Sequence, residues 1–231
     1  MQFFASEQFG FYDKLITDNY LGLLTLGNVV YPWLVWLFYA NLELKSTSEG
    51  ISVKSFVNGV KISLDRSVLT LIFGMKFIDN APSNLTRKMA KDLCLTQFAC
   101  LAKVEAYTRR RKAPPYHVLY PEPRLLHYVF IRICYPKDHS KEAYNEIALE
   151  AVYRLISGYS INYASVILHH LYHIANLNRN PSLPYGNLLT RIFTHFNVPL
   201  DGEECSTHLV PIISTNSLKT LRFYKTESRG W

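Results

Sequence analysis

Two histidines in the second half of the chain have a spacing that could bind a metal ion. The string HHLYH places His169 and His173 four residues apart, so a helix would present both imidazoles on one face. The string lacks the glutamate of zinc proteases, and no cysteine or carboxylate close by in sequence completes a ligand set. We therefore interpret both as helix-surface or partly buried side chains, and we predict no metal ion and no cofactor.

A row of carboxylates recurs every four residues at Glu142, Glu146 and Glu150. Carboxylate metal sites in helical bundles also use a Glu-x-x-His motif on facing helices, and this motif does not occur in the chain. The row is therefore typical of a solvated helix face.

The strings of common catalytic and nucleotide-binding sites do not occur: there is no GxxxxGK[ST], GxGxxG or GxSxG. The four cysteines form no CxxC pair and are too sparse for a disulfide framework, which favours a reducing compartment. We predict no catalytic residues and no enzyme. The alternative is a catalytic site assembled from residues distant in sequence, namely His127, His169, His173 and Glu105.

A basic run, Arg109, Arg110, Arg111 and Lys112, lies between Tyr107 and Tyr116. Positive charge with interleaved aromatic rings is typical of nucleic-acid surfaces, and a short basic run can also be a nuclear address. The formal charge of +7 agrees with an anionic partner. These six residues are the predicted nucleic-acid contacts, with an ordinary solvated loop as the alternative.

The elements that would position these residues are mainly helical. Apolar periodicity predicts helices over 6–20, from Pro32 onward, and over 85–107, 124–135, 140–157, 161–177 and 184–196, with Gly158 and Asn197 as stops. Asp65 is the expected N-cap of a further helix that ends at Gly74. A loop is expected around 81–83.

One β-hairpin is predicted, because Asn58-Gly59 joins two β-prone stretches and both residues readily adopt positive φ. Gly50 is assigned to an ordinary loop. The predicted fold class is mainly α: a multi-helix globular domain with one small β-hairpin at about Val53–Leu64.

A length of 231 residues with 48% hydrophobic content predicts a single domain over 1–231 with a substantial core. Four prolines between 114 and 123 make regular structure unexpected, so 108–123 is interpreted as an internal Pro-rich basic loop. The uncharged run 19–42 is long enough to span a bilayer, but Gly22, Asn28 and Pro32 interrupt it, and a buried helix is favoured. The N-terminus lacks a secretion signal, so we expect an intracellular protein of the nucleus or cytoplasm.

Four strings in order carry a resemblance to a known family: PWLVWLFYANL, SFVNGVKISLD, RLLHYVFIRICYPKDHS and LPYGNLLTRIFTHFNVPL. Together with both ends of the chain they resemble the family catalogued as "putative plant transposon protein domain". That family is related in style to the first-open-reading-frame proteins of Athila-type, gypsy-like plant retrotransposons. One departure is Trp36-Leu37 before FYANL, where such proteins tend to carry charge. The resemblance implies transposable-element ancestry in a plant and no catalytic residues.

We therefore expect a non-enzymatic, transposable-element-derived protein that is structural or nucleic-acid-associated, a gag-like or accessory segment. The alternative is a protein-interaction module that self-associates through exposed aromatic side chains among Trp33, Trp36, Tyr39 and Tyr159.

Overall fold

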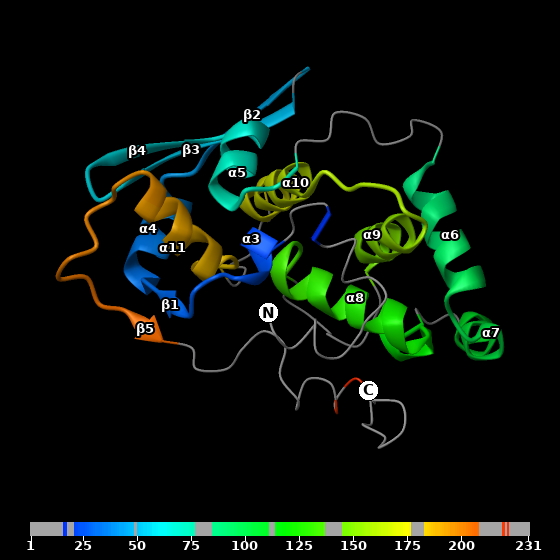
Figure 1. Ribbon diagram of the computed structural model, residues 1–231. Helices are drawn as coiled ribbons and strands as arrows, with labels where there is room; N and C mark the ends of the chain where they lie inside the picture. Colours follow the sequence, from blue (N-terminus) through cyan, green and yellow to red (C-terminus); the bar gives the residue numbers. More distant parts are fainter. Residues whose placement is uncertain are drawn as a thin grey trace. The chain divides into compact units, whose positions relative to one another are not determined.

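In the computed structural model (Figure 1), the described residues are 16–17, 21–48, 50–76, 85–110, 114–136, 145–176, 183–207, 219 and 221. The chain divides into two compact units. The sheet unit consists of Asp18–Phe77 and Asn162–Pro211, and the helical unit of Met1–Thr17, Ile78–Ile161 and Ile212–Trp231. The chain is mainly helical with a small sheet, as predicted, while the single domain over 1–231 stays a prediction.

The sheet unit is built on three antiparallel strands in the order β2 (Glu43–Thr47), β3 (Gly50–Val57), β4 (Val60–Leu64). In β3 the side chains of Ile51, Val53, Ser55 and Val57 are buried. This face packs against α4 (Pro32–Ala40), α5 (Arg66–Phe73) and α10 (Tyr163–Ala175). The alternation of buried and exposed residues thus places the core on one side of the sheet.

The predicted hairpin is confirmed as β3–β4, but the sheet is larger than predicted. Asn58 and Gly59 have φ of 47° and 84°, and Val57 pairs with Val60, as a two-residue turn of this type requires. The third strand, β2, was not predicted because its sequence, ELKST, has only one large apolar residue. Gly50 is not in a loop, since it opens β3 with φ of 125°.

Replacing Gly59 with Val tests this turn. The β-branched side chain opposes positive φ, and we expect a loss of about 1–3 kcal/mol in the free energy of unfolding. Gly27 is the matched control, because its φ lies outside the left-handed region and an added Cβ there meets no described atom within 4 Å. Thermal unfolding should give Gly59→Val the lower midpoint, and equal midpoints for Gly59→Val and Gly27→Val would contradict the turn.

The predicted boundaries of α5 are confirmed. The Asp65 carboxylate accepts a hydrogen bond from the Val68 amide at 2.8 Å, and Gly74 ends the helix with φ of 62°. A short helix, α3 (Leu21–Leu24), lies against the end of α5, because a Cβ added to Gly22 would be 1.8 Å from the carbonyl oxygen of Phe73. Glycine is thus the residue that permits this contact.

The last helix of the sheet unit is α11 (Gly186–His195), close to its predicted range, and Asn197 follows it with φ of 54°, as expected for a stop. Two-residue strands, β1 (Val29–Val30) and β5 (Ser206–Thr207), pair nearby. Phe38 of α4 and Phe193 of α11 are both fully buried, with ring centroids 6.3 Å apart. These rings form the aromatic centre of the sheet unit's core.

The helical unit contains α6 (Arg87–Gln97), α7 (Leu101–Arg109), a 3-10 helix η1 (Tyr116–Val118), α8 (Pro121–Ile133) and α9 (Glu146–Ile156). Helix α9 packs on both α6 and α8. It begins after Asn145, whose side chain caps it, and Gly158 follows it with φ of 79°. The predicted stop at Gly158 is confirmed, whereas the predicted start at 140 is wrong, because Asn145 is extended.

The single helix predicted over 85–107 is wrong, because residues 98–100 separate α6 from α7. Their backbone bonds to the segment before α8 instead of continuing the helix. The Cys100 amide donates to the Val118 carbonyl at 2.8 Å, and the Tyr120 amide donates to the Phe98 carbonyl at 2.9 Å. These partners are distant in sequence, so local periodicity does not reveal the break.

The Pro-rich segment is also more regular than predicted. Val118 and Leu119 are buried, and Pro121 and Pro123 lie in the first turn of α8, where a helix needs no amide donor. The helix predicted over 124–135 therefore starts three residues earlier. Residues 111–113 lie outside the described residues.

The uncharged run 19–42 forms α3, β1 and α4 rather than one helix. Among the described residues, the helices are too short or too polar to cross a membrane. Three predicted segments lie wholly or mostly outside the described residues: the helix over 6–20, the loop at 81–83 and residues 140–144. Of the first, Ile16 and Thr17 are described and are helical.

Candidate binding surfaces

The two spaced histidines lie on α10, and both side chains are exposed. Their neighbour His170 is buried, and its Nδ1 lies 2.7 Å from the hydroxyl of Tyr185. Within the described part of the chain, His, Cys, Asp and Glu side chains form no group of three or more that could hold a metal ion.

The other candidates for a dispersed catalytic site lie in the helical unit in unlike surroundings. His127 is fully buried on α8, its ring stacks on Tyr116 at 6.2 Å, and its Nε2 accepts a hydrogen bond from the Asn145 amide at 3.2 Å. Glu105 is exposed and pairs with Arg109 at 3.3 Å. His127 thus ties the start of α9 to α8 as a neutral ring, and Glu105 belongs to a surface ion pair.

The carboxylate row is not simply solvated. Glu146 pairs with Lys91 at 2.9 Å and Glu150 pairs with Arg87 at 3.2 Å, so both carboxylates of α9 face α6. Glu150 also accepts from Arg154, a buried arginine, at 3.0 Å. The solvated-face prediction therefore holds for Glu146, whose side chain is 56% exposed, but not for Glu150, which is only 20% exposed; both residues join α6 to α9. Glu142 lies outside the described residues.

The cysteines differ sharply in accessibility. Cys94 and Cys134 are buried, and desolvation raises the pKa of the Cys94 thiol to about 12 and that of Cys134 further still. Cys205 is exposed. Burial therefore keeps the first two protonated at neutral pH and withholds the reactive thiolate.

A thiol reagent at pH 8 should therefore modify Cys205 rapidly in the folded protein. Cys94 and Cys134 should react only after unfolding in urea. Mass spectrometry of the modified protein gives the sites, and Cys205→Ser should remove the fastest reaction and leave the half-buried Cys100 as the most accessible thiol. Rapid modification of Cys94 in the folded protein would contradict its burial.

The predicted nucleic-acid residues occupy the end of α7 and η1. None of the nine residues of α7, all of which the structure describes, is buried. Arg109 and Arg110 are exposed, while Arg111 and Lys112 lie outside the described residues. The rings of Tyr107 and Tyr116 are half-buried and contact His117, with centroids 6.2 and 6.4 Å apart. The structure therefore exposes Arg109 and Arg110, while both tyrosine rings are engaged within the protein.

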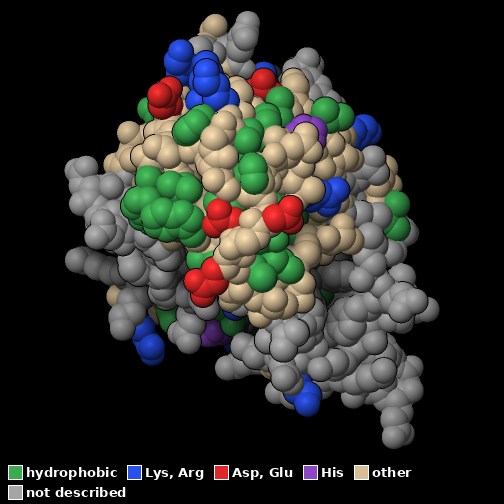
Figure 2. Space-filling model, turned by 90° about the vertical axis from the view of Figure 1, so that its left-hand side faces the viewer, with side chains coloured by type: hydrophobic (Ala, Val, Ile, Leu, Met, Phe, Trp, Pro, Cys, Tyr) green, Lys and Arg blue, Asp and Glu red, His purple; other side chains and the backbone are tan. Residues whose placement is uncertain are grey.

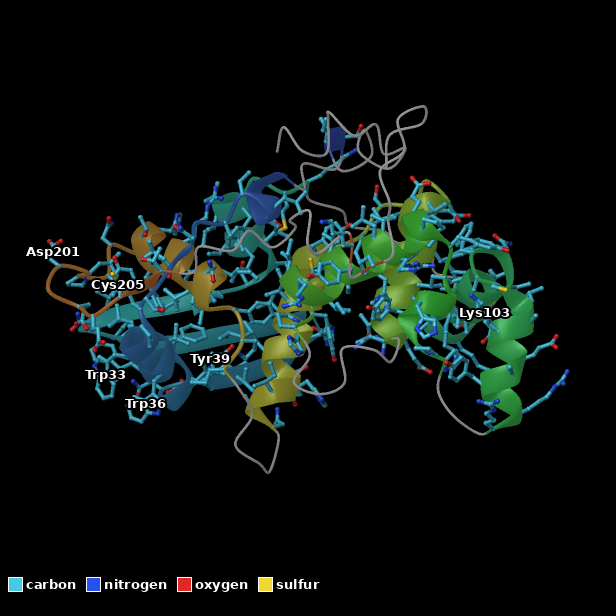
Figure 3. The ribbon with its side chains drawn as sticks, turned by 90° about the horizontal axis from the view of Figure 1, so that it is seen from below. Trp33, Trp36, Tyr39, Lys103, Asp201 and Cys205 are labelled. Atoms are coloured by element: carbon cyan, nitrogen blue, oxygen red, sulfur yellow. The ribbon has the colours of Figure 1, made fainter. Side chains whose placement is uncertain are left out.

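An aromatic pair stands out on α4. Trp33 and Trp36 are 55% and 50% exposed, and their rings stack with centroids 4.8 Å apart. Both side chains extend outward from the helix in Figure 3. Tyr39 is half-buried, and its hydroxyl donates to the Pro184 carbonyl at 3.0 Å. Tyr159, of the helical unit, is exposed separately.

Acidic residues lie close to the start of the same helix. The segment 201–204 contains Asp201, Glu203 and Glu204 and leads into β5, which pairs with the strand directly before α4. Figure 2 shows the corresponding arrangement on this face, with a compact hydrophobic patch beside acidic side chains and basic side chains gathered at the upper edge.

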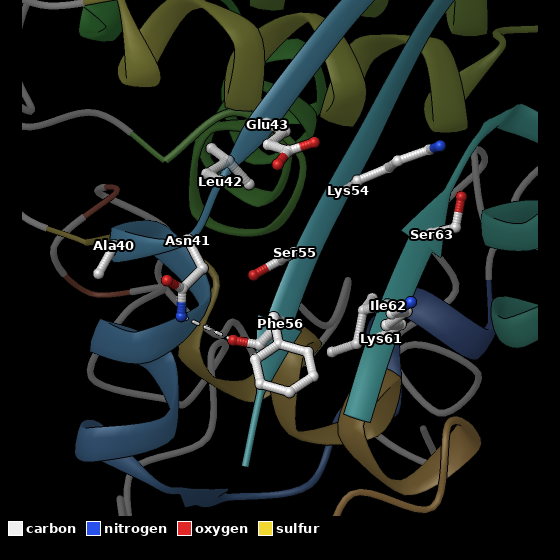
Figure 4. A pocket seen from close by; sticks show the side chains of 10 residues that line it. All are labelled: Ala40, Asn41, Leu42, Glu43, Lys54, Ser55, Phe56, Lys61, Ile62 and Ser63. Atoms are coloured by element: carbon white, nitrogen blue, oxygen red, sulfur yellow. Dashed lines mark hydrogen bonds between the residues drawn. The ribbon is translucent and has the colours of Figure 1, made fainter. Parts of the chain in front are cut away.

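A further surface, which was not predicted, is the open face of the β2–β3–β4 sheet (Figure 4). It carries Lys45, Lys54, Phe56 and Lys61, all exposed. The alternation that predicted the hairpin core also assigns Lys54, Phe56 and Lys61 to the opposite face, so the signal was available in the sequence.

The fold is that of a mainly helical domain with a small antiparallel sheet. Residues 22–199 match the family described as "Putative plant retrotransposon-related domain", and the chain belongs to this family. The match confirms the resemblance seen in the sequence strings. No significant match was found among curated proteins or among solved structures.

Proposed function

We propose that this transposon-derived domain is non-enzymatic and binds nucleic acid as a gag-like or accessory component. The exposed basic end of α7 is the observation that carries the proposal. Helix α7 has no buried residue and so adds little to the core. Lys103, Arg109 and the C-cap residue Arg110 are all exposed to solvent.

The chemistry of this surface suits a phosphate backbone. The Arg109 side chain is 80% exposed, and its pairing with Glu105, itself 64% exposed, is the kind of surface ion pair that contributes little and exchanges readily. Guanidinium groups bind phosphate oxygens in a fork geometry and release condensed counterions on doing so. The family membership supports a role in a mobile element, and the net charge of +7 supports an anionic partner.

Fluorescence anisotropy with a labelled 20-nucleotide single strand and a duplex of equal length tests the proposal. Affinity should fall steeply between 50 and 300 mM salt. Arg109→Glu/Arg110→Glu should weaken binding on the order of tenfold or more and reduce the salt slope by about two. The control, Lys76→Glu/Lys88→Glu, changes two exposed lysines and gives the same net charge. No binding of either nucleic acid at 50 mM salt would refute the proposal.

A second candidate function, self-association, is favoured by the stacked pair Trp33 and Trp36. Two adjacent tryptophan rings that are each about half exposed form an apolar patch that is unusual on the surface of a monomer. The acidic residues at 201–204 lie near the start of α4. A second copy of this basic chain would supply lysine and arginine side chains, which can pair with these carboxylates and pack on the tryptophan ring faces.

Light scattering tests self-association. A mass above that of the monomer should fall to the monomer value in Trp33→Ala/Trp36→Ala. The control Tyr159→Ala removes an exposed aromatic ring of the helical unit and should change nothing. A strict monomer at high protein concentration would refute self-association.

A further inference from the structure

We propose that the open face of the β2–β3–β4 sheet is a binding site for single-stranded nucleic acid, in which Phe56 stacks on a base and the lysines bind flanking phosphates. This inference rests on the proposed function, but it assigns a separate site and a strand preference that the basic end of α7 does not imply.

The strand register brings the charged groups together on one face. Glu43 lies opposite Lys54, which in turn lies opposite Ser63 on β4. Lys61 lies opposite Phe56. Neighbouring strands are ~4.8 Å apart and a strand rises ~3.4 Å per residue, so the backbone positions of Lys61 and Lys54 lie about 5 and 7 Å from that of Phe56. Lys45, at the centre of β2, adds a third ammonium group, and together with the Glu43 carboxylate these give a net charge of +2 on this face.

Phe56 is the unusual residue on this surface. It is 49% exposed, whereas its neighbours Ser55 and Val57 are buried on the opposite face. An aromatic ring on an open sheet face contributes little to the core, yet it offers a flat π-surface to a base. Base–aromatic stacking of this kind is the sequence-tolerant contact of single-strand binding proteins.

The backbone at Phe56 is held in place. The Asn41 side chain donates to the Phe56 carbonyl at 2.8 Å, and the Ser55 hydroxyl donates to the carbonyl of Phe38 on α4 at 2.8 Å. Asn41 thus occupies the edge of β3 beyond the end of β2, where an added strand would otherwise pair. The face of the sheet, rather than this edge, is therefore the surface offered to a ligand.

A hollow of about 730 Å³ lies over this face and is lined by Asn41, Glu43, Lys54, Phe56, Lys61 and Ser63, among others (Figure 4). Its volume lies in the range of small-ligand sites, ~300–1,000 Å³. The lining combines an aromatic ring, two ammonium groups, one carboxylate, an amide and hydroxyls, so the ammonium groups outnumber the carboxylate. A nucleotide presents the matching base face, phosphate and polar base edge.

The geometry distinguishes a single strand from a duplex. In a duplex each base is stacked on its neighbours and its faces are covered, so only phosphates could reach the lysines. An unpaired base can turn one face onto the Phe56 ring while the flanking phosphates meet Lys54 and Lys61. We therefore expect a preference for single strands with little dependence on sequence.

Anisotropy with a labelled 12-nucleotide single strand and the matching duplex tests the site in the full chain. Phe56→Ala should weaken single-strand binding roughly 5- to 150-fold, the effect of losing one base-stacking contact, and leave duplex binding unchanged. Phe56→Tyr should retain binding, because the ring remains. The matched control is Leu71→Ala, which removes another exposed apolar side chain of the sheet unit, 72% exposed, and should have no effect. Circular dichroism confirms that each variant is folded.

A spectroscopic variant reports stacking directly. The indole fluorescence of Phe56→Trp should be quenched by the single strand and not by the duplex, after subtraction of the unsubstituted protein's signal. Lys54→Ala/Lys61→Ala should weaken binding and lower its salt dependence.

The outcomes separate this inference from the proposed function. Binding that is lost in Arg109→Glu/Arg110→Glu but unchanged in Phe56→Ala overturns the sheet site and leaves nucleic-acid binding intact. Loss of nucleic-acid binding in Phe56→Ala but not in Arg109→Glu/Arg110→Glu supports the sheet site and overturns the assignment to α7. The inference is also overturned if the protein binds the duplex as tightly as the single strand. It is likewise overturned if the protein binds anionic phospholipid vesicles through Phe56 and does not bind nucleic acid. No nucleic-acid binding by any form refutes both.

Discussion

Replacing Gly22 with Ala should destabilise the sheet unit by about 3 kcal/mol or more, at the upper end of the cost of overpacking. The new Cβ would stand 1.8 Å from the carbonyl oxygen of Phe73, a backbone atom that cannot rotate away. Arg191 fixes the same contact, because its guanidinium donates to the Gly22 carbonyl at 3.0 Å and lies 5.4 Å from the centre of the Phe73 ring. The clash between the new Cβ and the Phe73 carbonyl oxygen can therefore be relieved only if α3 moves away from α5.

Urea unfolding measures this effect, with Gly27→Ala as the control. Both substitutions change glycine to alanine within a few residues, but only Gly22 is enclosed. A midpoint for Gly22→Ala equal to that of Gly27→Ala would contradict the close approach of α3 to α5.

Replacing Phe38 with Ala should cost about 3–5 kcal/mol, the usual range for emptying a buried phenyl site. The Phe38 side chain has no exposed area and lies between the sheet and α11, where it meets Phe193. Its backbone carbonyl accepts the Ser55 hydroxyl, so the helix stays attached to β3 and cannot close the cavity fully.

The matched control is Trp36→Ala, two residues earlier on the same helix. Its side chain is larger but half exposed, so we expect a loss below about 1 kcal/mol, in line with surface substitutions. Urea midpoints in the reverse order would mean that α4 is rotated about its axis relative to the sheet.

The features predictable from sequence are those fixed by local backbone chemistry. Asn58-Gly59 determines the hairpin because few residue pairs tolerate positive φ twice, and Asp65 and Gly74 bound α5 through bonds within one helical turn. The family resemblance was also readable, from the order of its strings.

Features that depend on distant partners were not predictable. Strand β2 has little apolar character and exists because β3 offers it an edge. The break between α6 and α7 is stabilised by residues 118–120. The sequence of α9 also does not reveal that Glu146 and Glu150 pair with Lys91 and Arg87 of α6.

The exposure of side chains at the candidate surfaces was also not predictable from the sequence. PWLVWLFYA is apolar all round, so its sequence does not say that both tryptophans face outward. The basic run was visible in the sequence, but the engagement of Tyr107 and Tyr116 with histidine rings was not, because His117 and His127 approach only after η1 and α8 have folded.

The division of each unit between distant stretches of chain imposes an order on biosynthesis. The ribosome delivers the three strands of the sheet long before α10, which covers part of their apolar face. Strand β1 pairs with β5 only after residue 207 has emerged. At a translation rate of ~5–20 residues per second, the growing chain carries a partly uncovered hydrophobic sheet for several seconds or more. Arg124 likewise waits for the carbonyl of Leu221, which it binds at 2.8 Å. Native packing of both units is therefore completed only after residues 207 and 221 have emerged from the ribosome.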